Sequence, residues 1–150
     1  MPVHRMTRTD AATAASLLDA FNREFDTPTP GVDALTARLA VLAGRDDVVV
    51  LLAGEHDGVA VVSFRQSVWA DGTIALLDEL YVRPALRGRG LGSELLSAAS
   101  DTARAGGSEE LEINVDGEDH DARRFYERHG FTNIEPGASE PMYFYYRRLV

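Results

Sequence analysis

The 150-residue sequence contains no cysteine, and all fifteen of its basic residues are arginine, so it contains no lysine either. Without cysteine the chain cannot form disulfides, thiolate metal sites or a cysteine nucleophile. Without lysine it cannot form the Gly-Lys-Ser/Thr end of a P-loop nucleotide site. The sequence also lacks an apolar run of membrane-spanning length and an apolar signal segment at its start, so we expect a cytoplasmic protein with no membrane partner.

The formal net charge of −9 makes phosphate backbones poor partners, so no nucleic-acid partner is expected. An acidic chain attracts cations, amines included, although solubility alone would also explain the charge. The four histidines are scattered without zinc-site spacing, and no metal is expected. A 45% apolar content over this length predicts one globular domain covering residues 1–150.

Helical and strand periodicities are mixed along the chain. Four helices are expected: one capped by Asp10 with Leu17, Leu18, Phe21 and Phe25 on one face, and others at about Val32–Ala43, Ser93–Ala105 and Asp121–His129. Strands are expected at Val3–Met6, Val48–Ala53, Val59–Gln66, Thr73–Val82, Leu111–Val115 and Met142–Leu149. Hairpin turns join the early strands, and a helical crossover precedes a later one, so a mixed sheet in an α+β fold is predicted.

The segment Arg87–Gly92 joins the end of a predicted strand to the start of a predicted helix. Its glycines allow successive N–H groups to turn inward at the positive end of the helix, and arginines flank them, which favours a phosphate ligand over a simple flexible turn. The glycines follow a two-residue rhythm that does not fit the dinucleotide-binding spacing. The spacing that they do fit is R-x-x-G-x-G.

The stretch Leu77–Pro84 followed by Arg87–Gly92 resembles the acetyl-CoA motif of the GNAT family of N-acetyltransferases. The segment Ala122–Phe131 resembles that family's second motif, with its Tyr…Gly-Phe ending. The order of elements also matches, so the resemblance covers nearly the whole chain. It implies a GNAT fold, with a central mixed sheet of about six to seven strands flanked by about four helices.

The resemblance also implies how acetyl-CoA, the expected co-substrate, is bound. Backbone groups of one strand would pair with the pantetheine arm, and N–H groups of the glycine-rich loop and helix start would hold the pyrophosphate. The implied cofactor-binding residues are Leu80, Tyr81, Val82, Arg87, Gly88, Arg89, Gly90, Leu91, Gly92, Ser93 and Asp119. Asp119 stands where relatives often have asparagine, which leaves its contact with the pantetheine arm open.

The candidate acid that protonates the departing thiolate is Tyr126, which matches the family's tyrosine; packing beside Phe125 is its alternative role. Asp78 and Glu79 are adjacent carboxylates in an apolar strand. Strict alternation would point them to opposite faces, so one of them is expected to bind or deprotonate the amine, unless a bulge intervenes or a salt bridge makes it structural. His120 is a second candidate base.

Several other features leave alternatives open. The acidic segment Glu109–Asp121 would attract a cationic acceptor or form a solvated loop, and Trp69 would line an acceptor pocket or pack. In the last predicted strand, one face of the four consecutive aromatic residues 143–146 is expected in the core. The other face would border the acceptor site or a homodimer partner.

These features lead to an acetyl-CoA-dependent N-acetyltransferase acting on a primary amine, either a small polycationic amine or a peptide amine. Direct attack in a ternary complex is expected, since no cysteine is present to carry an acetyl group. The alternative is a non-catalytic acyl-CoA-binding sensor or regulatory module. A toxin-like transferase acting on charged tRNA is disfavoured by the negative charge.

Overall fold

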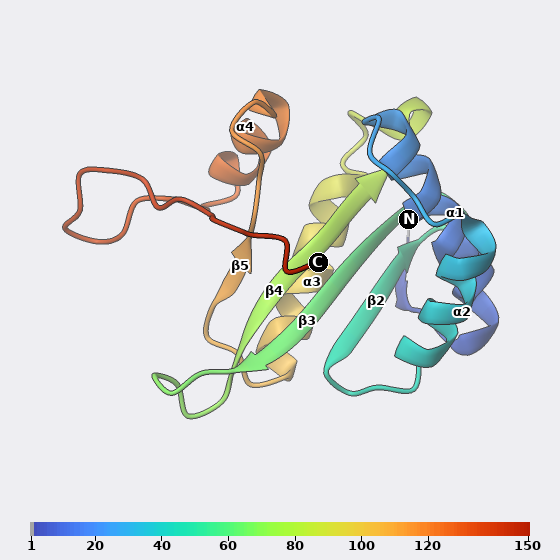
Figure 1. Cartoon of the computed structure of the whole chain (residues 1–150), viewed down its shortest axis with the longest axis horizontal. Helices are drawn as coiled ribbons and strands as arrows, with labels where there is room; N and C mark the ends of the chain where they lie inside the picture. Colours follow the sequence, from blue (N-terminus) through green and yellow to red (C-terminus); the bar gives the residue numbers. More distant parts are fainter. Residues whose placement is uncertain (1) are drawn as a thin grey trace. The chain divides into compact units, whose positions relative to one another are not determined.

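The computed structural model describes residues 2–150, which form two compact units with their boundary between Ile113 and Asn114. The first unit contains a sheet and three α-helices (Figure 1). Its strands are β1 (Val3–Arg5), β2 (Val48–Ala53), β3 (Gly58–Gln66), β4 (Thr73–Val82) and β5 (Leu111–Ile113). Its helices are α1 (Ala11–Glu24), α2 (Val32–Leu42) and α3 (Leu91–Ala105), with short 3-10 turns at Arg8–Asp10 and Pro84–Leu86.

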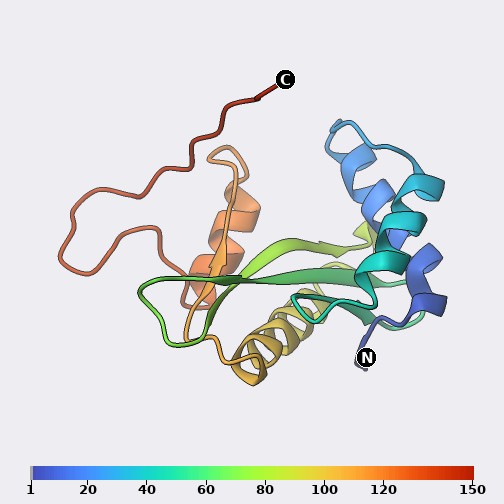
Figure 2. The same ribbon diagram turned by 60° about the horizontal axis from the view of Figure 1, so that its bottom comes forward.

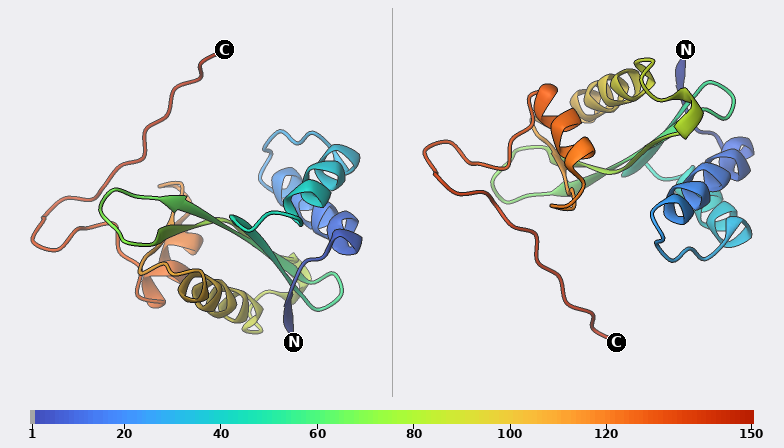
Figure 3. Two further views of the ribbon diagram at one scale, coloured as in Figure 1. Left: turned by 90° about the horizontal axis from the view of Figure 1, so that it is seen from below. Right: turned by 90° about the horizontal axis from the view of Figure 1, so that it is seen from above.

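The five strands lie in the order β1-β2-β3-β4-β5. The first three pairings are antiparallel and β4 pairs with β5 in parallel, so the sheet is mixed as predicted. Helices α1 and α2 cover one face and α3 covers the other (Figures 2 and 3). This two-sided cover explains why β2 is an unbroken apolar run, buried from Val49 to Ala53.

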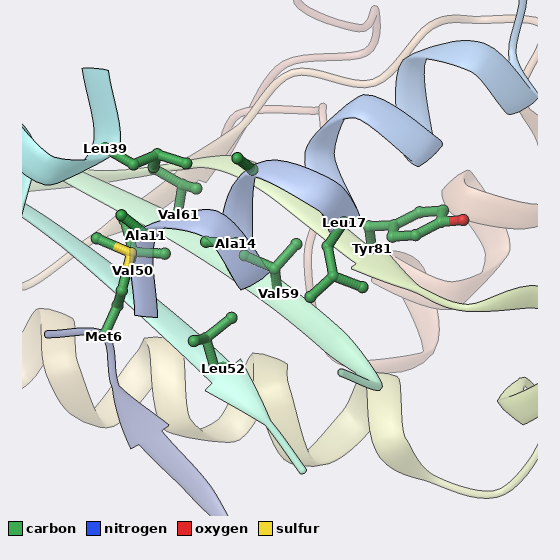
Figure 4. Close-up of a cluster of buried hydrophobic side chains, with 11 residues drawn as sticks. Met6, Ala11, Ala14, Leu17, Leu39, Val50, Leu52, Val59, Val61 and Tyr81 are labelled. Carbon is green, nitrogen blue, oxygen red and sulfur yellow. The ribbon is translucent and has the colours of Figure 1, made fainter. Parts of the chain in front are cut away.

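The core on the α1/α2 face is built from small and branched side chains (Figure 4). Leu17 of α1 and Val59 of β3 are fully buried there, and Tyr81 at the end of β4 is 4% exposed. Phe21 of α1 stacks on the Tyr81 ring, with 5.0 Å between ring centroids. This packing fixes the last turns of α1 against the end of β4, where the predicted site begins.

The second unit, Asn114–Val150, contains one helix, α4 (His120–Arg128). The Asp119 carboxylate caps it by accepting a hydrogen bond from the Ala122 N–H at 3.1 Å. Tyr126 makes edge-to-face ring contacts with Phe125 and Phe131. These aromatic contacts are the packing that organises this unit.

The expected strand Met142–Leu149 is wrong, and the sheet has five strands in place of six or seven. Within the second unit this segment has no strand to pair with, and only one backbone hydrogen bond is seen, from Met142 N–H to the Asn133 carbonyl at 2.6 Å. Alternating apolar residues indicate a strand only where a partner strand accepts the backbone groups. The second unit by itself buries neither face of residues 143–146, which are all at least 69% exposed.

The other predicted elements are confirmed with small shifts of their ends. Helix α3 starts at Leu91, two residues before the predicted Ser93, because Gly90 caps it in a left-handed conformation. Asp10 precedes α1, but its carboxylate accepts hydrogen bonds from Thr7 and caps the preceding 3-10 turn. Within residues 2–150, no helix is both long enough and apolar enough to cross a bilayer.

Candidate functional site

Strand β4 contains a β-bulge at its two carboxylates. Leu77 lies opposite Val62 of β3, but Glu79 lies opposite Val61, so Asp78 is an extra residue. Cross-strand partners share a sheet face, so Glu79 lies on the α1/α2 face with Val61. Without the bulge, Glu79 would share the opposite face with Leu77.

Asp78 shares this face, because Leu76 lies opposite Ser63, which alternates with Val61 along β3, and Asp78 alternates with Leu76 along β4. The expectation that strict alternation separates the two carboxyl groups is therefore wrong. Both side chains remain open to solvent, at adjacent positions on one face. The bulge thus creates a pair of acidic groups where regular pleating would give a single one.

Although both side chains are exposed, the surrounding protein shields each carboxyl group from part of its water. Burial raises the pKa of Glu79, and the neighbouring charge of Asp78 raises it further. Burial also raises the pKa of Asp78, while the Ser63 hydroxyl opposes that shift by stabilising the ionised form. Within residues 2–150, no group donates a hydrogen bond to Glu79, so of the two carboxyls Glu79 is the better proton acceptor.

Beyond the bulge, one edge of β4 lacks a partner strand. The parallel pairing with β5 stops at Leu77 and Ile113, whereas the pairing with β3 continues to Val82. Along the described chain, no other strand adjoins the stretch from Asp78 to Val82 on the side away from β3. An extended ligand can pair with backbone groups on such an edge.

The chain leaves β4 through a short 3-10 turn, Pro84–Leu86, and enters the glycine-rich loop. Gly88 and Gly90 have φ angles of 75° and 84°, in the left-handed region that favours glycine. Helix α3 then starts at Leu91, which is buried, so the N–H groups of its first turn lie next to this loop. This arrangement of glycines and a helix N-terminus suits an anionic ligand such as a diphosphate.

The two arginines of the loop have different environments. The Arg87 guanidinium forms an ion pair with Glu24 of α1 at 2.8 Å, a partner that the sequence pattern did not indicate. Arg89 is exposed and, within the part of the chain described, has no ion-pair partner. Arg89 is therefore the loop side chain that is available to a bound phosphate.

The remaining predicted site residues lie in the second unit. Tyr126 is half-buried among aromatic rings, and Asp119 uses its carboxylate to cap α4. Capping satisfies one Asp119 oxygen with a backbone donor, a structural role that the sequence pattern alone did not separate from ligand binding. His120 is the first residue of α4 and is exposed. The catalytic and cofactor-binding roles expected of these residues stay predictions.

Other candidates have simpler environments. Trp69 is 93% exposed in the β3–β4 turn and borders a hollow of about 270 Å³ together with Asp71 and Glu109. In the acidic segment 109–121, Glu112 forms an ion pair with Arg65 at 2.7 Å. Within residues 2–150, no group of three or more histidine, cysteine or acidic side chains could hold a metal ion.

The first unit thus combines a strand with an unpaired edge and a glycine-rich loop at a helix N-terminus. The profile of the acetyltransferase (GNAT) family matches residues 14–131. The uncharacterised N-acetyltransferase YhfO of Bacillus subtilis is 30% identical over 134 residues, which are 87% of this chain and 89% of that protein. The chain therefore belongs to the acetyltransferase (GNAT) family.

Two other relatives match over shorter stretches. Mycothiol acetyltransferase of Beutenbergia cavernae is 41% identical over 56% of this chain and 28% of its own length. Aminoalkylphosphonate N-acetyltransferase of Salmonella typhimurium is 41% identical over 55% of this chain and 54% of its own length. The chain thus spans less than two thirds of either relative.

Among solved structures, a protein of Arthrobacter sp. FB24, provisionally described as an acetyltransferase, is 58% identical. It superposes with a TM-score of 0.93 over 99% of this chain and 96% of that one. An aminoglycoside acetyltransferase from an uncultured soil sample, 20% identical, has a TM-score of 0.80 over 99% of this chain and 96% of its own. At that identity the likeness shows the fold alone. The predicted GNAT family and α+β fold class are thereby confirmed.

Proposed function

We propose that this protein transfers an acetyl group from acetyl-CoA to a primary amine. The proposal rests on the order of groups along β4 and the loop that follows it. Two carboxyls on one face are followed by an unpaired strand edge, and that edge leads through a short turn to the glycine-rich loop. A ligand with an extended amide-containing arm and a diphosphate would match this order of groups.

We infer which residues of the first unit would hold such a ligand. Backbone groups at Leu80 and Val82 would pair with the pantetheine arm as an added strand. The N–H groups of residues 87–92 and the start of α3 at Ser93 would hold the diphosphate, with Arg89 adding charge. Acetyl-CoA, when bound, supplies an acetyl group activated as a thioester.

The carboxyl pair would prepare the acceptor. An alkylamine is mostly protonated at neutral pH, and only its neutral form attacks a carbonyl carbon. Asp78 would hold the ammonium group by charge, and Glu79, with its raised pKa, would accept the proton directly or through water. Backbone N–H groups near Leu80 would stabilise the carbonyl oxygen as negative charge develops on it. Tyr126 would donate a proton to the departing sulfur.

The acceptor we propose is a small polycationic amine or a peptide amine. The net charge of −9 and the adjacent carboxyls favour a cation. One relative, named for aminoalkylphosphonates, is consistent with an amine substrate. A CoA sensor without catalysis is the weaker alternative, since it would need no desolvated carboxyls on this face.

The test is an acetylation assay with a panel of polyamines, aminoglycosides, amino acids, aminoalkylphosphonates and peptides. Products are identified by mass spectrometry and CoA release is measured in parallel. We expect amine-dependent release of CoA and an acetylated product from a cationic member of the panel. Tight CoA binding with no product from any amine would favour the sensor.

A further inference from the structure

The carboxylate of Glu24, at the end of α1, is bonded to a loop residue 63 positions further along the chain. Arg87 donates from Nη1 to Oε2 and from Nη2 to Oε1 of Glu24, each at 2.8 Å. The Tyr81 hydroxyl donates to Oε1 of the same carboxylate at 3.3 Å. The two-point pairing of a planar guanidinium with a carboxylate is strong and directional.

Arg87 is also held from two other sides. Its Nε donates to the Val82 carbonyl at 2.9 Å, and its guanidinium carbon lies 5.5 Å from the centre of the Tyr81 ring. Tyr81 in turn stacks on Phe21 of α1. The side chains of Arg87 and Glu24 are 42% and 28% exposed, so this pair is more constrained than an ordinary surface ion pair.

The loop that follows Arg87 has little packing of its own. A Cβ atom built on Gly88 or Gly90 would meet nothing within 4 Å, and both residues are exposed. A glycine-rich segment loses much conformational entropy when a ligand orders it, and that loss weakens binding. A fixed point at Arg87 restricts the loop before the ligand arrives.

We propose that Glu24 is a positioning residue for the diphosphate of CoA: through Arg87 it holds the loop in the conformation that directs its N–H groups to the ligand. This inference rests on the proposed function of the loop. The Arg87 guanidinium then serves as the anchor of the loop, because its fork is already paired with a carboxylate. A positioning role for Glu24 and a purely electrostatic effect predict opposite changes in CoA affinity. Removing the negative charge of Glu24 would by itself strengthen the attraction for a diphosphate, whereas loss of the positioning contact would weaken binding.

Calorimetric titration with CoA of the wild type, Glu24→Ala and Glu24→Gln provides the test. We expect Glu24→Ala to raise the Kd about tenfold, and Glu24→Gln, which keeps one acceptor oxygen, to raise it less. The control is Asp47→Asn, which weakens another two-point pair, Arg45–Asp47, in which Nε and Nη2 donate to the carboxylate, both at 2.8 Å. That pair lies between α2 and β2, and its loss should leave the Kd unchanged. The KM for acetyl-CoA should rise with the Kd, while kcat changes by less than about twofold.

Hydrogen exchange in the absence of ligand gives a second readout. Amides of residues 88–92 should exchange faster in Glu24→Ala and Glu24→Gln than in the wild type. In Asp47→Asn their exchange rates should equal those of the wild type. If Glu24→Ala does not fold, Glu24→Gln by itself provides the test. Unchanged or tighter CoA binding in the Glu24 variants, with normal binding by the wild type, would overturn the positioning role and leave the proposed function intact. A wild-type protein that does not bind CoA would overturn both.

Discussion

Glu79 of β4 lies opposite Val61 of β3, although regular pairing from Leu77 and Val62 would place Val61 opposite Asp78. This one-residue shift moves Glu79 to the face that already carries the Asp78 carboxyl. The acidic pair therefore results from backbone geometry as much as from side-chain identity.

Glu79→Gln is expected to lower kcat/KM for the amine by about 10²-fold or more, the usual contribution of a general base. Asp78→Asn should act mainly on the KM for the amine. In the wild type, activity should rise with pH as Glu79 loses its proton, with an apparent pKa above the ordinary glutamate value, because desolvation raises it. Steady-state pH profiles of the three proteins check this. If Glu79→Gln kept the same loss of activity at low pH as the wild type, another residue would be the general base.

The same substitution should stabilise the protein at neutral pH. A carboxyl with a raised native pKa binds its proton more tightly in the folded state, so its ionisation costs stability as pH rises above the ordinary carboxyl pKa. Glu79→Gln removes that cost. The Tm at pH 7 should rise by roughly 1–3 °C, a small value since the group is solvent-accessible, and the difference should vanish near pH 4. A Tm that falls at pH 7 would show that Glu79 stabilises the fold.

The predictability of the fold differs between elements. The ends of β2 and β4 agree with the sequence prediction, because apolar runs and turn residues are local signals. The bulge at Asp78 depends on the register of the neighbouring strand, which local alternation does not contain. The same limit applies to Met142–Leu149, where the pattern of a strand is present without a partner strand in the second unit.

The candidate site was predictable where a motif is continuous in sequence. The glycine-rich loop and its place between a strand and a helix follow from spacing alone. The partner of Arg87 could not be predicted in this way. Glu24 lies 63 residues away at the end of α1, and no local pattern links the two residues. Arginine next to glycine indicates a phosphate site, but it does not show whether the guanidinium binds the ligand or holds the loop.

Gly90→Ala should cost about 1 kcal/mol of stability, because the residue has a positive φ and an added methyl group meets no other atom. It should also weaken CoA binding by displacing the N–H groups of the loop. Gly107→Ala is the matched control, because Gly107 has a φ of 83° and equally open surroundings just after the end of α3. Denaturant unfolding should show similar losses of stability in the two variants. Calorimetry should show weaker CoA binding in Gly90→Ala alone. Equal affinities would separate the loop from CoA binding.

Tyr126→Phe should lower kcat while leaving the Kd for CoA within about twofold, because it removes only the hydroxyl that we propose as the proton donor to the sulfur. Tyr145→Phe, at an 86% exposed position, is the control and should retain full turnover. Stopped-flow or steady-state rates across pH distinguish the two. Unchanged turnover in Tyr126→Phe at every pH would leave Tyr126 with its aromatic packing role.

Asp119→Ala removes the side chain that caps α4 and should destabilise the protein by about 1 kcal/mol. Asp119→Asn retains an oxygen that can accept the Ala122 N–H and should preserve most of that stability. Unfolding of both variants, with CoA titration alongside, separates the cap from a ligand contact. A loss of CoA affinity in Asp119→Asn at unchanged stability would assign the carboxylate to the ligand.

The most direct test of the account is hydrogen exchange of the wild-type protein with and without saturating CoA, followed by mass spectrometry of overlapping peptides. If the open side of β4 and the glycine-rich loop form the binding site, CoA should slow exchange in peptides spanning residues 80–93 and leave those of α2 and β2 unchanged. Protection that falls elsewhere, or no protection at any CoA concentration, would contradict it.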